Sequence, residues 1–198
     1  QKVQARLSQV GTPLRQGYFD CSLQNGKLVK SWFVPETDGY VRIYREPEAG
    51  EAYVLGGDTA GCGTDYFAAQ VLNARTGEQT AVLHHRFDED LFARQVVSLA
   101  RYYNEALVGV ESNYSTYPIR EIERLGYRNQ YIREASDTFT GRMIRAYGFR
   151  TTAVTRPVIL GELVRVVRES PQLFYDRQTL EEMLTFVRSE NGRPEAQQ

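Results

Sequence analysis

The sequence has few cysteines and histidines, and each shortage excludes a class of protein. Its two cysteines, Cys21 and Cys62, are too few for the disulfide framework of a small secreted protein, and their separation is not that of a zinc finger. We expect both to be free thiols. The two histidines, His84 and His85, are adjacent, so on a strand they would point to opposite faces and would not chelate one metal ion together. We expect them to pack or to lie at the surface.

Long apolar runs and several functional motifs are also absent. No apolar run approaches 18 residues, and no charged, apolar, small-residue leader opens the chain, so neither a membrane span nor a secretory signal is expected. The sequence has no Gly-x-Ser-x-Gly nucleophile elbow and no Gly-x-x-x-x-Gly-Lys-Ser/Thr loop. These absences exclude a serine hydrolase of that type and an ATPase motor, and they favour an intracellular protein that is not secreted.

Lysine is scarce, and the charge is nearly balanced. The chain has 24 Lys and Arg against 25 Asp and Glu, a net charge of −1, which argues against a strongly basic nucleic-acid binder. The cations are nearly all arginines, whose planar guanidinium suits phosphate better than lysine does. Arginines outnumber acids between residues 120 and 168, and Arg142, Arg145 and Arg156 are candidate DNA contacts there. Ordinary surface ion pairs are the alternative interpretation.

The most informative segment runs from Gly56 to Asp65. It follows the apolar run 53–55 and leads into the apolar stretch 66–72, which predicts a strand, an acid, a tight glycine turn and a second strand. Asp58 would lie where a buried strand ends. Glycines on both sides would leave its flanks open to a metal ion, a phosphate or a nucleic-acid backbone.

Glu111 is the acid expected to face Asp58. It ends the run 106–110, which is apolar without alternation and suits a strand covered on both faces. Two strand-like segments and a helical pattern over 88–104 lie between the acids, and this β-β-β-α-β order lets the first and fourth strands lie side by side. Neighbouring carboxylates resist ionisation, and divalent cations, most naturally magnesium or manganese, remove that penalty. A pair of such ions is the usual device for cleaving a phosphodiester bond.

The remaining elements are predicted from local signals. Asn25-Gly26 indicates a hairpin between strands at 18–23 and 28–34, and a short strand follows at 40–44. Capping residues and apolar periodicity predict the other helices. These helices are expected at 115–125, from Thr155 onward, and at 177–187 with Asp176 as cap. Residues 131–132 are expected to form a strand, and 134–150 a loop or hairpin that touches DNA or gates the site.

The order and spacing of three motifs resemble the nuclease domain of the large terminase subunit of tailed bacteriophages. The motifs are Gly57-Asp58-Thr59-Ala60-Gly61, then Gly63 with Asp65, then Val110-Glu111-Ser112-Asn113. The resemblance implies an α/β fold, a ribonuclease-H-like mixed β-sheet flanked by helices with an N-terminal β-hairpin extension. It implies a metal-dependent endonuclease that cuts double-stranded concatemeric viral DNA with two metal ions. Asp58 matches the first-strand ligand, Glu111 the fourth-strand ligand, and Asp65 a further acid of the same loop.

The resemblance also carries expectations about organisation. Residues 1–198 would form one nuclease domain, with a linker or helix remnant at 1–16, a β extension at 17–50 and the ribonuclease-H-like core at 51–198. In that family a third acid opens a C-terminal helix, so the third ligand is expected beyond Gln198, and Asp176, Glu190 and Glu195 do not fit its pattern. An upstream ATPase motor, the portal and the small terminase subunit are the implied partners, in the host-cell cytoplasm.

Three other interpretations remain open at the level of sequence. Another ribonuclease-H-like nuclease, such as a Holliday-junction resolvase, shares the acid pattern. Sugar kinases and actin-like ATPases carry a similar strand-Asp-Gly-Thr turn that cradles phosphate, but they need two lobes and only one fits this length. In a non-catalytic DNA-binding module, Asp58 and Asp65 would cap turns and Glu111 would pair with an arginine.

Overall fold

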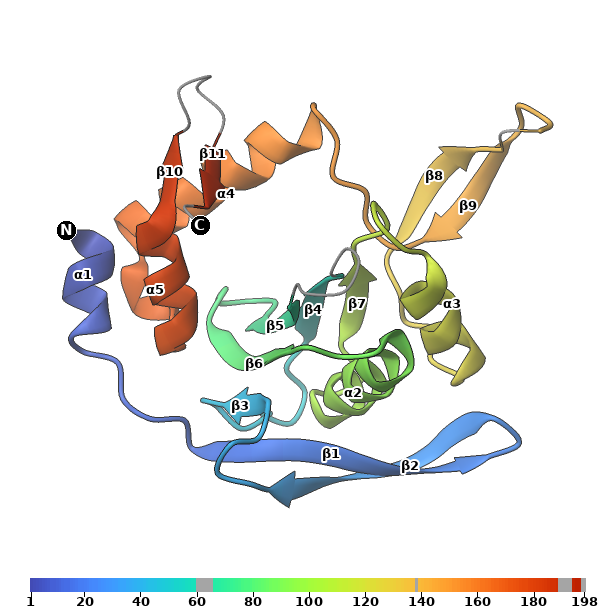
Figure 1. The fold of residues 1–198 in the computed structure, drawn as a ribbon, viewed down its shortest axis with the longest axis horizontal. Coiled ribbons are helices and arrows are strands. Elements are labelled where there is room, and N and C mark those ends of the chain that lie inside the picture. Colours follow the sequence, from blue (N-terminus) through green and yellow to red (C-terminus); the bar gives the residue numbers. More distant parts are fainter. Residues whose placement is uncertain (60–65, 138, 189–193, 197–198) are drawn as a thin grey trace.

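A curled, mixed seven-stranded sheet organises the molecule (Figure 1). The computed structural model describes residues 1–59, 66–137, 139–188 and 194–196. The strand order is β2-β1-β3-β6-β5-β4-β7, and every neighbouring pair is antiparallel except β4 and β7, which are parallel. The strands are β1 (Arg15–Gln24), β2 (Lys27–Pro35), β3 (Val41–Ile43), β4 (Tyr53–Asp58), β5 (Phe67–Asn73), β6 (Gln79–His85) and β7 (Leu107–Val110).

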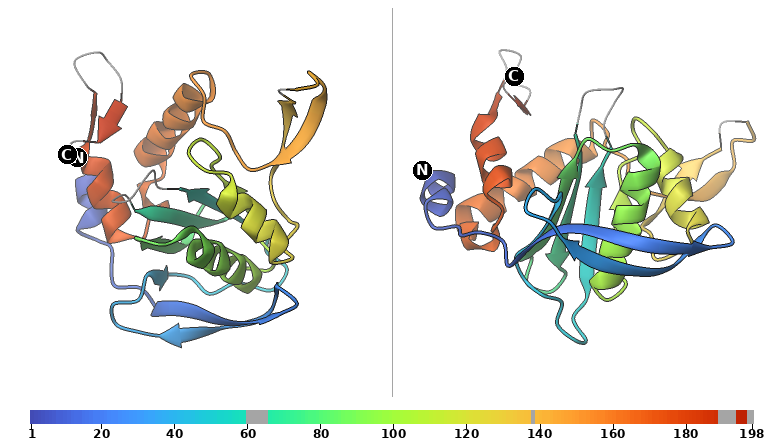
Figure 2. Two further views of the ribbon diagram at one scale, coloured as in Figure 1. Left: turned by 45° about the vertical axis from the view of Figure 1, so that its right-hand side comes forward. Right: turned by 60° about the horizontal axis from the view of Figure 1, so that its bottom comes forward.

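Helices flank this sheet, and two short strand pairs lie outside it (Figures 1 and 2). The helices are α1 (Lys2–Leu7), α2 (Glu89–Tyr102), α3 (Tyr117–Arg124), α4 (Thr155–Glu169) and α5 (Arg177–Thr185), with a 3-10 turn at Pro171–Leu173. The strand pairs are β8 (Ile132–Ser136) with β9 (Met143–Tyr147) and β10 (Phe186–Arg188) with β11 (Pro194–Ala196). Within the described residues, no helix is long and apolar enough to cross a membrane.

Helix α2 forms the core with one face of the sheet. The apolar residues predicted to share a helix face, Phe92, Val96, Leu99 and Tyr103, are all fully buried, so this prediction is confirmed. The buried amide of Gln95 also meets β1. Its Nε2 donates to the carbonyl of Phe19 at 2.6 Å, and its Oε1 accepts from the Phe19 N–H at 3.0 Å. The curled sheet is therefore fixed to α2 by both apolar packing and backbone hydrogen bonds.

The predicted N-terminal hairpin is present and extends the sheet beyond β3. Asn25 and Gly26 have φ angles of 50° and 74°, the left-handed conformation that a two-residue hairpin turn needs. Before the hairpin, residues 1–16 were expected to be a linker or helix remnant. They contain the short helix α1, which packs beside α5. Arg6 Nε of α1 donates to the Phe174 carbonyl at 2.7 Å.

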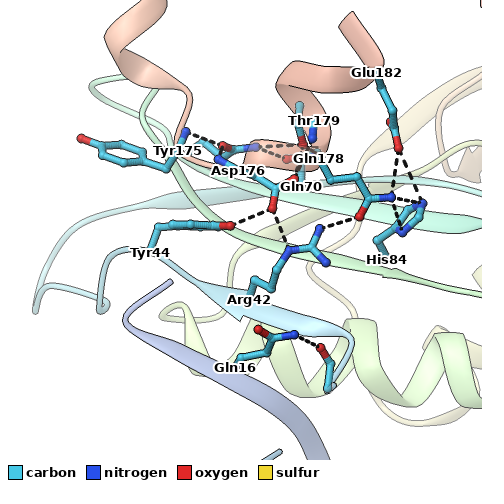
Figure 3. Close-up of polar contacts among 12 residues, drawn as sticks. Gln16, Arg42, Tyr44, Gln70, His84, Tyr175, Asp176, Gln178, Thr179 and Glu182 are labelled. Carbon is cyan, nitrogen blue, oxygen red and sulfur yellow. Dashed lines mark hydrogen bonds and ion pairs between the residues drawn. The ribbon is translucent and has the colours of Figure 1, made fainter. Parts of the chain in front are cut away.

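On the other face, α5 is fixed by a buried ion pair (Figure 3). The Asp176 carboxylate accepts from Arg42 Nε at 2.7 Å, from the Tyr44 hydroxyl at 2.8 Å and from the Thr179 N–H at 2.8 Å. Burial alone would raise the pKa of Asp176, but Arg42 and Thr179 outweigh it and hold that pKa below its ordinary value. The predicted helix cap is thus also the anchor of α5 on β3.

Several predicted boundaries need correction. The last helix ends at Thr185 rather than Val187, because residues 186–188 pair with residues 194–196 as strands. The strand expected at 131–132 begins at Ile132 and continues to Ser136 as one arm of the β8–β9 hairpin. Helix α4 forms where predicted, but none of its residues is buried.

We predict that Asp176→Ala destabilises the protein by about 3–5 kcal/mol, because it leaves the partly buried Arg42 without its carboxylate. Urea unfolding followed by circular dichroism measures this loss. Asp38→Ala, at an exposed loop position, is the control and should change the free energy of unfolding by less than about 0.5 kcal/mol. Equal stability of the two variants would contradict the role given to the ion pair.

Candidate functional site

Asp58 and Glu111 meet at the ends of the two parallel strands. Gly57 of β4 pairs with Val110 of β7, so the two acids are the next residues in register. The Glu111 N–H donates to the Gly57 carbonyl at 2.8 Å, which carries the pairing one residue further. Their carboxyl groups are close enough for Glu111 to raise the pKa of Asp58. The structure thus brings together the two acids that the sequence singled out.

The acid pair disfavours ionisation of Asp58. Partial burial and the neighbouring Glu111 carboxylate raise the pKa of Asp58 to about 7, against the opposing effect of a hydrogen bond from the Thr59 N–H. Asp58 therefore keeps its proton to a higher pH than an isolated aspartate does. Asp58 is still exposed to solvent on one side and Glu111 is half-buried, so a cation has access to both.

A cavity of about 630 Å³ opens beside the pair. Its floor is the face of β4, β5 and β7 that α2 does not cover, where Gly56 places no side chain over the sheet. Tyr131, Phe149 and Ile159 form walls, from the base of the β8–β9 hairpin and from α4. The lining is mostly apolar, and the acids stand at one end of it.

The walls are fixed to the acid-bearing strand by backbone hydrogen bonds. The N–H groups of Tyr131 and Phe149 donate to the carbonyls of Val108 and Val110 at 2.7 and 2.8 Å. Gly148 turns the chain into this position with a φ of 90°, and a Cβ there would lie 2.9 Å from the Val110 carbonyl oxygen. These wall residues were not predicted, because their position depends on pairing between distant segments that no local pattern encodes.

The loop after Glu111 is held by a reciprocal pair. Asn113 Nδ2 donates to the Thr151 carbonyl at 2.8 Å, and the Thr151 N–H donates to Asn113 Oδ1 at 3.1 Å. Ser112 Oγ donates to the Phe149 carbonyl at 3.0 Å. The sequence identified Ser112-Asn113 only as part of a motif, and the structure shows that both residues fix the position of the loop.

The other candidate acids are either outside the described residues or already bound to a partner. Asp65 and Cys62 of the glycine turn, and Glu190 near the chain end, lie outside the described residues. Asp176 is bound to Arg42, consistent with its rejection as a ligand. Across residues 1–59, 66–137, 139–188 and 194–196, no group of three or more His, Cys, Asp or Glu side chains is placed to hold a metal ion. The third ligand and Asp65 therefore stay predictions.

The histidines and candidate arginines lie in distinct places. His84 stacks on Tyr66, whereas His85 stacks on Tyr40, so they point to opposite faces and the packing role predicted for them is confirmed. Arg142 and Arg145 are exposed on and beside β9, on a hairpin that projects from the body (Figure 2). Arg156 lies in the first turn of α4.

This arrangement, a mixed sheet with a parallel pair of acid-terminated strands and flanking helices, is ribonuclease-H-like, as the resemblance implied. The chain is similar to the crystal structure of the large terminase nuclease from thermophilic phage G20c. The TM-score is 0.59 at 14% identity, covering 99% of this chain and 88% of that one. The same nuclease with bound magnesium gives a TM-score of 0.60 at 13% identity, and the match covers 98% of this chain and 86% of that one.

The nuclease domain of the large terminase of Thermus phage P74-26 gives a TM-score of 0.56 at 14% identity, covering 97% of this chain and 83% of that domain. No family model matches the sequence. No curated protein matches it either. At these identities the likeness establishes the fold, which is that of the large terminase nucleases.

We predict that Asp58→Asn changes how stability depends on pH in the metal-free protein. The pKa of Asp58 is higher in the folded than in the unfolded chain, so its contribution to stability is present below pH 4 and is lost as the pH rises to about 7. Solvent screening at this exposed position reduces the effect. At pH 8 the variant should melt about 2–4 °C higher than the wild type, a gain of about 1 kcal/mol.

Differential scanning fluorimetry in EDTA between pH 5 and pH 8 measures this difference, with Asp38→Asn as the control. The gap between Asp58→Asn and wild type should widen as the pH rises. A gap that stays constant across the range would show that the pKa of Asp58 is not raised in the folded protein.

Proposed function

We propose that this chain is the nuclease domain of a viral DNA-packaging terminase, a divalent-metal-dependent endonuclease that hydrolyses phosphodiester bonds of double-stranded concatemeric DNA. The observation that carries the proposal is the contact between Asp58 and Glu111 at adjacent strand ends, beside an open cavity. The fold shared with the phage G20c and P74-26 nucleases supports it.

The donor set fits a hard divalent cation. The two neighbouring carboxyl groups offer oxygen ligands, and a cation bound to both would offset the repulsion that helps to raise the pKa of Asp58. Asp58 and Glu111 would hold magnesium or manganese, Asp65 would tune or complete the ligand shell, and a further acid beyond Gln198 would be the third ligand. The phage G20c nuclease has been solved with bound magnesium. When bound, a pair of such ions supplies an activated water and stabilises the leaving oxygen.

The chain's own residues prepare this site. Asp58 must lose its proton before it binds a cation, so we expect cation affinity to rise between pH 6 and pH 8. The Thr59 N–H favours the ionised form of Asp58 and holds its carboxylate in place. Gly56 keeps the sheet face beside the acids free of side chains, and the hairpin base closes the far side of the cavity.

Arginines near the site would neutralise DNA phosphates. In the described part of the chain, no carboxylate pairs with Arg142 or Arg145, and both are exposed. Arg156, in the first turn of α4, is the third candidate. An upstream ATPase motor, the portal and the small terminase subunit are the partners that this function would bring together in the host cytoplasm.

Removing either acid tests the proposal directly. We expect Asp58→Ala and Glu111→Ala each to lower plasmid nicking in manganese by at least about 100-fold, because neither carboxylate alone holds the ions. A gel assay of supercoiled plasmid measures the rate, and circular dichroism checks that each variant folds. Glu36→Ala, at an exposed position after β2, is the control. Cleavage at the wild-type rate by either variant would remove the nuclease assignment.

The hairpin arginines make a separate prediction. Arg142→Gln combined with Arg145→Gln should weaken binding of a 30-bp DNA duplex and lower the slope of log Kd against log salt by roughly 2, one per lost phosphate contact. Fluorescence anisotropy at several salt concentrations measures both quantities. Arg165→Gln, whose guanidinium is already bound to Glu162 and Glu169, serves as the matched control. If all three proteins show the same slope, the hairpin does not contact DNA phosphates.

A further inference from the structure

A second group of side chains lies at the same sheet edge as the acids. Asp58 pairs with Ala68 of β5, and Ala68 pairs with His84 of β6. Residues paired across neighbouring strands point to one face, and strands lie about 4.8 Å apart, so the His84 Cα is about 10 Å from that of Asp58 across the sheet. His84 is therefore on the face that carries the acids.

Tyr66 and Arg86 continue this row toward solvent. Tyr66 immediately precedes β5 and Arg86 immediately follows β6, so both lie at the strand ends beside His84. The Tyr66 ring stacks on His84 with centroids 4.5 Å apart and an angle of 10° between the planes. The Arg86 guanidinium carbon lies 4.9 Å from the Tyr66 ring centroid. The result is a stack of His84, Tyr66 and Arg86 with the arginine on the outside.

The base of the stack is held by α5 (Figure 3). Gln178 Nε2 donates to His84 Nδ1 at 3.0 Å. Burial and the nearby Arg42 lower the pKa of His84, so the neutral imidazole accepts this hydrogen bond and forms a packed base. The α5 network that anchors on Arg42 and Asp176 thus extends to the ring under Tyr66.

The outermost group of the stack is the Arg86 guanidinium, a cation that a ligand can reach. Arg86 is exposed, and among the described residues no carboxylate pairs with it. An aromatic face beneath a guanidinium fixes its plane and leaves its edge donors free, and those donors match two phosphate oxygens.

We propose that Arg86 binds a backbone phosphate of the DNA near the phosphate being cut, and that Tyr66 is the positioning residue that orients it. This inference depends on the proposed function, since it takes the acid pair as the point of cleavage. A phosphodiester chain held at the acids and at Arg86 runs across the ends of β4, β5 and β6. The contact fixes the strand along this edge without reading bases.

The test compares Arg86→Gln with Arg75→Gln. Arg75 lies at the opposite end of the β5–β6 hairpin and pairs with Glu51. The Arg75→Gln substitution removes the same charge as Arg86→Gln does. Anisotropy with a 30-bp duplex in EDTA measures Kd at several salt concentrations. We expect Arg86→Gln to weaken binding roughly three- to tenfold and to lower the salt slope by roughly 1, and Arg75→Gln to match wild type.

Tyr66 variants separate positioning from simple charge. Tyr66→Phe keeps the ring and should bind and nick DNA as wild type does. Tyr66→Leu keeps Arg86 but removes its support, so it should raise the KM for nicking in manganese several-fold and leave kcat within about twofold. Equal KM values for the two variants would overturn the role of Tyr66. A salt slope for Arg86→Gln equal to that of Arg75→Gln would overturn the phosphate contact.

Failure of this inference is distinguishable from failure of the proposed function. If Asp58→Ala abolishes nicking and Arg86→Gln binds DNA as tightly as Arg75→Gln, the nuclease stands and the phosphate contact is wrong. If Asp58→Ala nicks plasmid like wild type, the nuclease assignment is wrong, whatever the salt slope of Arg86→Gln.

Discussion

The parallel pairing of β4 with β7 is the constraint on which the rest of this structure depends. All other neighbours in the sheet are antiparallel, and a parallel pair needs a long crossover, which β5, β6 and α2 supply. The register of that pair puts Asp58 beside Glu111, and the neighbouring carboxylate helps to raise the pKa of Asp58. This repulsion is tolerated because the crossover buries the apolar face of α2 against the sheet, which stabilises the fold far from the acids.

The two faces of the sheet have different roles. One is covered by α2 and is fully packed. The other is divided: α5 covers its β3 and β6 side through the network around Asp176, and the β4, β5 and β7 side opens into the cavity beside the acids (Figures 1 and 3). Ion pairs and hydrogen bonds join α5 to the β3 and β6 side of this face. The cavity on the β4, β5 and β7 side is therefore bordered by a fixed helix. A polymer lying across the strand ends would meet fixed groups on both sides of the acid pair.

Local signals in the sequence predicted much of this fold. The period of α2, the Asp176 cap of α5 and the Asn25-Gly26 turn each depend on a few neighbouring residues, and all are found. The convergence of Asp58 and Glu111 was also predictable, because both acids end apolar runs and the order of elements places those runs side by side. Two features were not predictable, since each depends on pairing between segments that are distant in the chain. They are the cavity walls at Tyr131 and Phe149 and the stack of Tyr66 on His84. The end of α5 was misplaced because residues 186–188 leave the helix to pair with residues 194–196, a local strand pair that the apolar pattern of the helix does not indicate.

The attachment of the β8–β9 hairpin has a mechanical consequence. Its two ends leave from the strand that ends in Glu111: Tyr131 and Phe149 bind the carbonyls of β7, and Glu111 itself bridges to Phe149. At the base of the hairpin, Gly148 lies so close to Ile119 and Val110 that a Cβ there would clash with both. The base of the hairpin and the backbone of Glu111 are therefore one hydrogen-bonded unit, so a displacement of residues 131 or 149 would also displace the backbone that carries this carboxyl group.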